Sequence, residues 1–426
     1  MEMYIVLAIA AFMIISFIIG KVPYGVTTMT CCVLLVLTGY CNIQTAFSGL
    51  ANKTTILIAG MFTLAYAFGK TSLINKIRGS MVRIKGKSGL ALIVFLYGIA
   101  IVISQLMGRA AVMSIMILFV QSLDDSDEIS ASRMIFAILS VVAIWSLNAP
   151  IGMGATKYAT INALYEGIAA NEAQMLKVTD PMKVAVLPAI LLTIYALFAW
   201  KFIPSHPIDV SNVKQVKETA AISKRDEVII TAVFAAVTIS FAWGDYIGSI
   251  MNIMPVVGVL ILIYTKCITV KEAVDNMTKD MTWMIAGGLV MSDVLGKSGV
   301  GELIGSGIIR ILGSNPSGWF VLTIFTVVSI VMTTFMSNTG TMAVLIPIGA
   351  STALAGGMDP RGIVIAINIA SILAIAFPSG SVEGAMTFAA GRHNPFKLLK
   401  YTVPYLIIAT AGIVLSAEFF FPIMGR

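Results

Sequence analysis

Small polar residues interrupt a long apolar run in this sequence, and their side chains suit a small ion or a polar solute. Ser337, Asn338 and Thr339 follow one another, Thr341 comes two positions later, and Pro347 closes the group. Hydroxyl, amide and backbone carbonyl oxygens are hard ligands for Na⁺ and hydrogen-bond partners for a carboxylate. These residues predict a binding segment that ends at Pro347, although small polar residues also join packed helices.

Arg109 is a second candidate, because it lies near the middle of the apolar stretch 89–121. A charged side chain in such a stretch is costly and usually functional. Arg109 could hold an anionic substrate as a two-pronged donor, or its charge could take the place of a bound cation. The alternative without a binding role is a side chain that extends to the edge of the apolar layer.

The glycine- and threonine-rich segment 150–162 follows another apolar run and is typical of a broken helix. Its free backbone groups, together with Thr156 and Asn162, can complete a substrate site beside Arg109. Lys157 in the same segment either adds positive charge to that site or anchors the segment at an interface.

The segment 378–384 repeats this pattern and adds a carboxylate, Glu383. Glu383 can be a cation ligand, a proton carrier, or the buried counter-ion of Arg109 or Lys157. A structural ion pair and a direct role in coupling both fit its position.

The composition places all four segments in a membrane. Of the 426 residues, 58% are hydrophobic and 12% charged, whereas about a quarter of the residues in soluble domains are charged. Long continuous apolar runs indicate helices rather than the alternating strands of a barrel. The net charge of +7 arises largely in short basic loops. We expect an all-α polytopic protein of the inner or plasma membrane, embedded in the lipid bilayer, with no nucleic-acid partner.

Hydropathy predicts about ten crossings and two hairpins that turn back inside the membrane. The crossings are at 3–20, 25–41, 53–69, 132–150, 183–201, 228–244, 249–266, 281–297, 361–377 and 401–422. The stretches 89–121 and 317–350 are interpreted as re-entrant hairpins because polar residues fall near their middles, with two plain spanning helices as the alternative. Basic loops after 69 and across 201–227 are expected in the cytoplasm, and the acidic loop 166–175 outside.

An internal repeat accompanies this pattern. The triplet Ile-Ala-Gly occurs at 58–60 and again at 285–287, an offset of 227 residues, and 106–110 falls opposite 335–339 at a similar offset. About five crossings before the central linker would turn the second copy upside down, as in many secondary transporters. The predicted organisation is a first repeat at 1–200 (scaffold helices 3–41, hairpin 89–121, broken helix 132–165), a linker at 201–227, and a second repeat at 228–426 (scaffold helices 228–266, hairpin 317–350, broken helix 361–390).

Catalytic chemistry has no matching pattern in the sequence. His206 and His393 are not spaced as metal ligands, and the four cysteines lack a metal-binding spacing. A glycine-rich Lys-Ser/Thr phosphate loop is also missing. We therefore expect no enzyme and no bound cofactor, with Na⁺ possible as a coupling ion.

Two hairpin-and-broken-helix units, the second bearing Ser337-Asn338-Thr339, resemble the divalent anion:sodium symporter family of the ion transporter superfamily, over roughly 45–422. The resemblance implies two Na⁺ sites with the substrate between them, and a homodimer whose transport domain moves like an elevator. Together with the residues discussed above, the expected substrate contacts are Ser337, Asn338, Thr339, Arg109, Thr156, Asn162 and Ser379. The expected cation ligands are Ser337, Asn338, Thr341, Gly380, Ser381 and Glu383.

The sequence departs from this family at the first hairpin, where Gly108-Arg109-Ala110 stands in place of Ser-Asn-Thr. The hypothesis that follows is that Arg109 replaces the first Na⁺, which gives weaker Na⁺ dependence or Na⁺-independent anion exchange. The predicted function is secondary transport of a small anion such as a dicarboxylate, citrate or sulfate. Alternatives are a cation/proton antiporter or arsenite-type permease, with Glu383 and Asp293 as proton carriers, and the membrane subunit of a binding-protein-dependent (TRAP-type) system.

Overall fold

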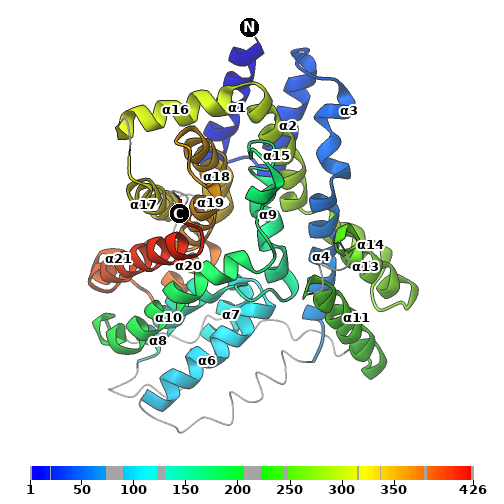
Figure 1. The fold of residues 1–426 in the computed structure, drawn as a ribbon. Helices are drawn as coiled ribbons and strands as arrows, with labels where there is room; N and C mark the ends of the chain where they lie inside the picture. Colours follow the sequence, from blue (N-terminus) through cyan, green and yellow to red (C-terminus); the bar gives the residue numbers. More distant parts are fainter. Residues whose placement is uncertain are drawn as a thin grey trace.

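The computed structural model describes residues 2–19, 21–72, 90–121, 130–205, 222–242, 248–313, 316–335, 337–378 and 381–423. Every regular element in these ranges is a helix. We call the residues before and after 206–221 the first half and the second half. Most of the predicted linker 201–227 lies outside the described residues, as does most of the basic loop after 69. Figure 1 shows the arrangement of the helices.

In its described residues, the first half contains four short 3₁₀ segments besides its α-helices. Its elements are α1 (Glu2–Ile19), α2 (Tyr24–Leu37), α3 (Ile43–Ala46), η1 (Ser48–Ala51), α4 (Lys53–Gly69), α6 (Leu90–Leu106), α7 (Arg109–Gln121), α8 (Ala131–Trp145), η2 (Gly152–Thr156), α9 (Lys157–Ala163), η3 (Glu172–Gln174), α10 (Asp180–Ala199) and η4 (Trp200–Phe202).

In the described residues, the helices of the second half follow the same order; the positions that correspond to α16 at the repeat offset, 73–85, lie outside the described residues. The elements of the second half are α11 (Lys224–Ala242), η6 (Gly248–Asn252), α13 (Met254–Tyr264), α14 (Val270–Met277), α15 (Asp280–Lys297), α16 (Val300–Leu312), α17 (Gly318–Phe335), α18 (Asn338–Ala355), α19 (Pro360–Ser371), α20 (Val382–Ala390) and α21 (Pro395–Phe420).

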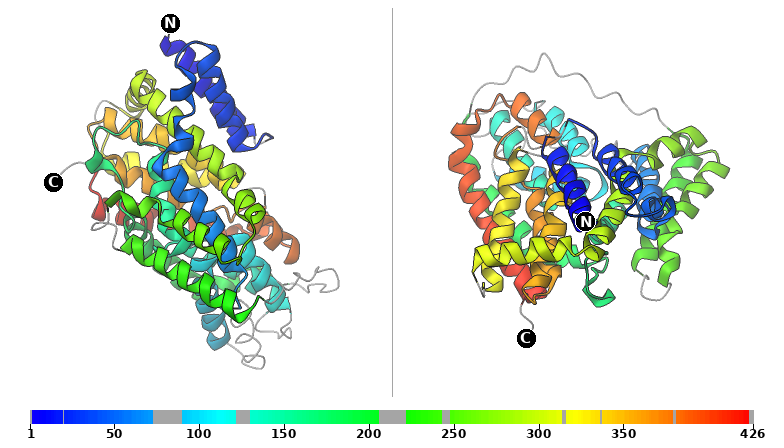
Figure 2. Two further views of the ribbon diagram at one scale, coloured as in Figure 1. Left: turned by 90° about the vertical axis from the view of Figure 1, so that its right-hand side faces the viewer. Right: turned by 90° about the horizontal axis from the view of Figure 1, so that it is seen from above.

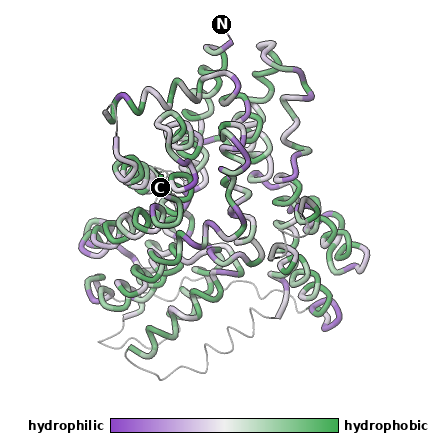
Figure 3. The backbone as a smooth tube through the Cα atoms, in the orientation of Figure 1, coloured by the Kyte–Doolittle hydropathy of each residue, from purple (hydrophilic) through white to green (hydrophobic). Residues whose placement is uncertain are grey.

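Each apolar run of the sequence overlaps one of these helices, and apolar residues dominate the helices in Figure 3. Within the described ranges, Asp180–Phe202, Gly318–Phe335 and Pro395–Phe420 are long and apolar enough to cross a bilayer alone. The helices α6–α7 and α17–α18 form the two hairpins, and α8–α9 and α19–α20 form the two broken helices. The predicted all-helical, polytopic fold with a hairpin and a broken helix in each repeat is confirmed.

Two local expectations need correction. Pro347 does not end its segment, because α18 continues to Ala355 while packed between α16 and α19, and this packing outweighs the lost backbone hydrogen bond. The helix α16 was not predicted. It begins after Gly299 (φ 76°) and ends before Gly313 (φ 112°), two left-handed positions that suit glycine.

Close glycine contacts reveal a two-fold relation between the halves. A Cβ atom on Gly60 of α4 would lie 2.8 Å from Cβ of Pro255 on α13, and one on Gly287 of α15 would lie 2.5 Å from Cβ of Thr28 on α2. Gly287 follows Gly60, and Pro255 follows Thr28, by the same 227 residues. The two contacts are therefore equivalents in the inverted repeats, and α2 packs on α15 as α13 packs on α4.

This contact supplies a testable expectation for stability. Gly60→Ala should destabilise the protein by about 1–3 kcal/mol, because the added methyl would meet backbone as well as side-chain atoms of Pro255. Gly69→Ala in the same helix is the matched control: nothing lies within 4 Å of its Cβ position, so alanine should leave stability unchanged or raise it by up to about 1 kcal/mol. Thermal unfolding in detergent would measure both, and equal melting temperatures would contradict the close packing.

Polar contacts also join the halves near the end of α4. Lys70 forms an ion pair with Glu272 of α14, and the hydroxyl of Tyr66 donates to the same carboxylate (2.8 Å). The hydrogen bonds from Lys70 and from the Thr269 backbone lower the pKa of Glu272 to about 2. The carboxylate is therefore ionised at neutral pH and holds α14 against α4.

The helices gather on two sides of the molecule. In Figures 1 and 2, α11, α13 and α14 pack with α4 on one side, whereas the hairpins, the broken helices, α10 and α21 lie together on the other. In the second group, the Tyr401 hydroxyl is 2.7 Å from Ser140 Oγ, and the Tyr405 hydroxyl donates to the Ser140 carbonyl (2.7 Å). These buried hydrogen bonds tie α21 of the second half to α8 of the first.

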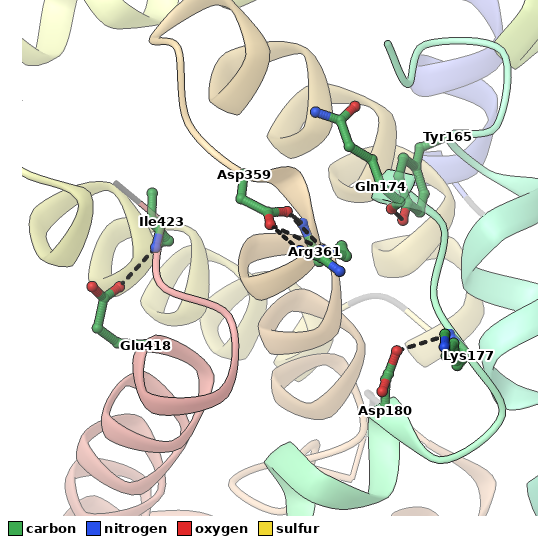
Figure 4. Close-up of polar contacts among 8 residues, drawn as sticks. All are labelled: Tyr165, Gln174, Lys177, Asp180, Asp359, Arg361, Glu418 and Ile423. Atoms are coloured by element: carbon green, nitrogen blue, oxygen red, sulfur yellow. Dashed lines mark hydrogen bonds and ion pairs between the residues drawn. The ribbon is translucent and has the colours of Figure 1, made fainter. Parts of the chain in front are cut away.

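A polar region surrounds the start of α19 (Figure 4). Arg361 pairs with Asp359 at 2.6 Å, and the Tyr165 hydroxyl donates to the carbonyl of Gln174 (2.5 Å) in the loop between α9 and α10. The carboxylate of Asp180 accepts from the backbone N–H of Lys177 at the end of that loop (2.8 Å). These contacts order the loop that connects the first broken helix to α10.

Candidate functional site

The tips of the two hairpins meet. The first tip is the turn at 107–108, after which α7 begins at Arg109; the second lies between the end of α17 at Phe335 and the start of α18 at Asn338. Ser337 caps α18, since its Oγ accepts from the backbone N–H of Gly340 (3.0 Å), and it hydrogen-bonds with the hydroxyl of Tyr24 on α2. The N-termini of two helices, where the helix dipole is positive, therefore adjoin.

Arg109 connects the first tip to three groups of the second half. Its Nη1 donates to the carbonyl of Ile372 (3.1 Å) and lies 3.2 Å from Oε1 of Glu383. The amide oxygen of Asn338 accepts from Nη1 at 3.0 Å and from Nη2 at 2.7 Å, once the amide is oriented so that both of its ends have partners. The guanidinium group thus lies between an amide, a carbonyl and a carboxylate, all from the other half.

The same amide orientation satisfies the nitrogen of Asn338. It donates to the carbonyl of Ser371 and to Oγ1 of Thr333, each at 2.8 Å, and Thr333 in turn donates to the Ser371 carbonyl. The carbonyl groups of Ser371 and Ile372 end α19 where the second broken helix unwinds. Both tips are therefore fixed on the end of one half-helix.

Glu383 comes from the second half of that broken helix. It lies in the first turn of α20, whose cap is Ser381: the side chain of Ser381 accepts from the N–H of Gly384 (3.0 Å). The Glu383 side chain is 9% exposed, and that of Arg109 18%. Burial of both charges makes their pairing costly to break. Ser379 and Gly380 lie outside the described residues.

The first broken helix unwinds between Trp145 and η2, and the end of α6 holds it open. Leu147 has a left-handed backbone (φ 53°), and its N–H donates to the carbonyl of Ser104 (2.9 Å). Gln105 donates to the carbonyl of Trp145 (2.7 Å) and accepts from the N–H of Ala149 (2.9 Å). One side chain of the hairpin therefore replaces the helical hydrogen bonds lost at the break.

Lys157 begins α9 and turns back into this break. Its ammonium group donates to the carbonyl of Ser146 (3.0 Å) and to Oδ1 of Asn148 (2.7 Å). Through Ser104 and Gln105 this break adjoins the first hairpin tip, which carries Arg109. Arg109, Lys157 and Glu383 thus form a largely buried cluster with two basic groups and one acidic group, which favours a negatively charged ligand.

The other predicted residues have different surroundings. Thr339 is partly exposed beside Asn338, whereas Thr341 is buried and its hydroxyl donates to the Ser337 carbonyl (3.1 Å). Thr156 is buried next to Lys157, and its carbonyl accepts from Thr160 (3.2 Å).

Asn162 binds the backbone rather than the tips: its amide donates to the carbonyl of Leu176 and accepts from the Leu176 N–H, both at 3.0 Å. The structure therefore gathers Arg109, Ser337, Asn338 and Glu383, while Asn162 holds the loop that precedes α10. The ligand contacts assigned to these residues remain predictions.

Sequence reasoning missed three residues that shape the site, and it identified Gln105 only as a polar residue near the middle of the first hairpin. Thr333 belongs to an apolar helix but is polar and lies within five residues of a tip, a signal that could have found it. Asn148 is also a polar residue at the end of an apolar run, two positions before Pro150, and could have been found in that way. Tyr24 had no such signal, because its contact with Ser337 joins segments more than 300 residues apart.

Relatives with matching sequence are transporters. The chain is 23% identical to an uncharacterized transporter of Haemophilus influenzae over 95% of this chain and 90% of that one. It is 24% identical to the sodium-dependent dicarboxylate transporter SdcS of Staphylococcus saprophyticus, over 36% of this chain and 30% of that one. With mouse solute carrier family 13 member 1 it shares 28% identity over 36% of this chain and 25% of the other.

Solved structures with the same fold are also transporters. The YdaH transporter of Alcanivorax borkumensis superposes with a TM-score of 0.59 and 13% identity, over 88% of this chain and 86% of that one. MtrF of Neisseria gonorrhoeae gives a TM-score of 0.62 and 14% identity, over 90% and 84% of the two chains. At these identities the likeness supports the fold alone.

A model of the citrate transporter family matches residues 14–370 and again 246–424. These ranges cover almost the whole chain, including both hairpins and both broken helices. Together with the solute carrier and dicarboxylate relatives, they confirm the resemblance to the anion symporters of the ion transporter superfamily. The chain belongs to the citrate transporter family.

Proposed function

We propose that this transporter carries a small carboxylate, a dicarboxylate or citrate, which binds at the meeting point of the two hairpin tips. The single observation that carries the proposal is the position of Arg109, whose guanidinium group lies against Asn338 of the opposite tip and against Glu383. A guanidinium group matches a carboxylate with two parallel hydrogen bonds. We propose that a substrate carboxylate displaces the carboxylate of Glu383 from the guanidinium group of Arg109.

The charge of the cluster favours an anion over a cation as cargo. Arg109 and Lys157 together outweigh Glu383, and a unit charge at about 4 Å contributes roughly 4 kcal/mol at an effective dielectric constant of about 20. A free cation would be repelled by that excess. Asp293, the second proton carrier of the antiporter alternative, pairs with Lys297 (2.8 Å) and its side chain is 39% exposed, so it has the surroundings of a surface residue.

Coupling and motion are part of the proposal. Ser337 and Ser381 each cap a helix in the second half with a hydroxyl oxygen, so we place any coupling Na⁺ beside these caps rather than at the guanidinium group of Arg109. We propose that the hairpins, the broken helices, α10 and α21 move as one body past α4, α11, α13 and α14, as an elevator does. The homodimer expected from the family resemblance stays a prediction.

Uptake by proteoliposomes tests the proposal. Purified protein would be given radiolabelled citrate, succinate or sulfate, with and without an inward Na⁺ gradient and with unlabelled anion inside. We expect saturable uptake of at least one carboxylate, stimulated by internal anion, with weak or absent dependence on Na⁺. Protein-free liposomes set the background. Uptake limited to cations, or a steep cooperative dependence on Na⁺, would overturn the proposed substrate class or coupling respectively.

A further inference from the structure

We infer that the ammonium group of Lys157 is a built-in monovalent cation that fills an oxygen site in the first broken helix, where a free ion would otherwise bind. The site consists of the Ser146 carbonyl and Oδ1 of Asn148, which we call the oxygen pair. The two oxygens lie 3.0 Å and 2.7 Å from Nζ of Lys157. The effect of this cation site on transport rests on the proposed function, whereas the existence of the site does not.

The oxygen pair is held by groups other than Lys157. Nδ2 of Asn148 donates to the carbonyl of Ile144 (2.5 Å), which fixes the amide so that its oxygen faces the ammonium group. The left-handed backbone of Leu147 places the flanking residues, and its N–H is held by Ser104. Gln105 fixes the break on both sides. We therefore expect the oxygen pair to persist when the lysine side chain is shortened.

The chemistry of the pair suits a monovalent cation. Both ligands are neutral oxygens, and neutral carbonyl oxygens compensate one charge more readily than two. The distances match ammonium, which makes hydrogen bonds of this length, and potassium, which is of similar size. A small alkylammonium ion or K⁺ is accordingly the ligand class that would replace the missing side chain.

The second half lacks this arrangement. At the repeat offset of 228 residues, which relates Pro150 to Pro378, the positions of Ser146, Asn148 and Lys157 become Ala374, Ala376 and Ala385. The first half therefore carries a lysine amine among oxygens in its break, whereas the second half has neither the lysine nor the amide. In the first break, Lys157 takes the place of an ion among oxygen ligands.

Thermal unfolding in detergent tests the site without any transport. Lys157→Ala would vacate the oxygen pair, whereas Lys157→Met would fill the same space with an apolar chain. We expect methylammonium or K⁺ at 100 mM, compared with choline at equal ionic strength, to raise the melting temperature of Lys157→Ala by several degrees. The wild type and Lys157→Met should shift by less than one degree. Identical responses in all three proteins would overturn the inference.

Two further variants complete the test: the first probes the oxygen pair, and the second, Lys157→Gln, covers the case in which Lys157→Ala fails to fold. Asn148→Leu added to Lys157→Ala should abolish the stabilisation by methylammonium, since one oxygen is removed. Lys157→Gln keeps a hydrogen-bond donor but no charge, and its uptake should fall at least tenfold while its melting temperature stays within a few degrees of wild type. Normal uptake by a folded Lys157→Gln would show that the charge is unnecessary.

The two proposals fail in distinguishable ways. If wild-type protein takes up no carboxylate but Lys157→Ala is stabilised by methylammonium, the proposed function falls and the cation site stands. If wild-type uptake is as proposed and no cation raises the melting temperature of Lys157→Ala, the cation site is contradicted and the proposed function is supported. Partial restoration of Lys157→Ala uptake by methylammonium, at least threefold over choline, is the result expected when both hold.

Discussion

Replacing Arg109 with alanine is expected to lower carboxylate uptake by at least about a hundredfold. Two hydrogen bonds to a charged group contribute roughly 1.5–3 kcal/mol each, and about 1.4 kcal/mol corresponds to a factor of ten. The change also removes the contacts of Arg109 with Asn338, Ile372 and Glu383, which hold the tips together. Initial rates of citrate or succinate uptake in proteoliposomes would measure the loss.

Part of that loss could reflect folding, because a buried carboxylate without its partner costs about 3–5 kcal/mol. The double variant Arg109→Gln with Glu383→Gln separates the two effects, since it leaves no unpaired charge at this contact. It should unfold near the wild-type temperature and still transport poorly. Arg109→Lys keeps the charge but not the planar fork and should retain an intermediate rate. Substantial uptake by the folded double variant would contradict a role for Arg109 in substrate binding.

Glu383→Gln is expected to separate exchange from net transport. Without the carboxylate, Arg109 is left free for substrate, so the apparent KM should fall several-fold. The empty carrier, in contrast, gains one unit of uncompensated positive charge, so its return across the membrane should slow and net uptake should fall at least tenfold. Exchange of external for internal substrate needs no empty return and should stay within about threefold of wild type.

Counterflow and net uptake, measured on the same proteoliposomes, give the two rates. Asp293→Asn is a suitable control, because it also removes a carboxylate, but one that lies outside the cluster of Arg109, Lys157 and Glu383. It should change neither rate by more than about twofold. Equal loss of exchange and net uptake in Glu383→Gln would indicate that Glu383 serves the folded structure rather than the empty carrier.

Hydropathy and spacing predicted the helices and the two hairpins, because a membrane requires long apolar runs and tolerates polar interruptions only at special places. The repeat offset, visible in Ile-Ala-Gly at 58–60 and 285–287, even anticipates which glycines lie at equivalent contacts. Arg109 and Asn338 were singled out by polarity in apolar surroundings, and the structure brings them into contact.

Side-chain partners were harder to predict than segments. Asn162 has the polarity of a ligand, but the direction of its amide toward Leu176 depends on a loop whose path no local pattern specifies. Lys157 could not be distinguished from an interfacial anchor, since the same residue type suits both places. Its position depends on the backbone of Leu147 and on Gln105 of another helix, and such tertiary contacts leave no periodic signal.

If the cluster of Arg109, Lys157 and Glu383 crosses the membrane as proposed, its excess positive charge makes the transport rate depend on the membrane potential. An empty carrier would move a positive charge through the membrane potential, and one loaded with a dianion would move a negative charge. Each unit charge that crosses the full field changes the free energy by about 2.3 kcal/mol per 100 mV. An inside-negative potential would then pull the empty carrier inward and push the loaded one outward, so its sign would help to decide whether the cell imports or exports the anion.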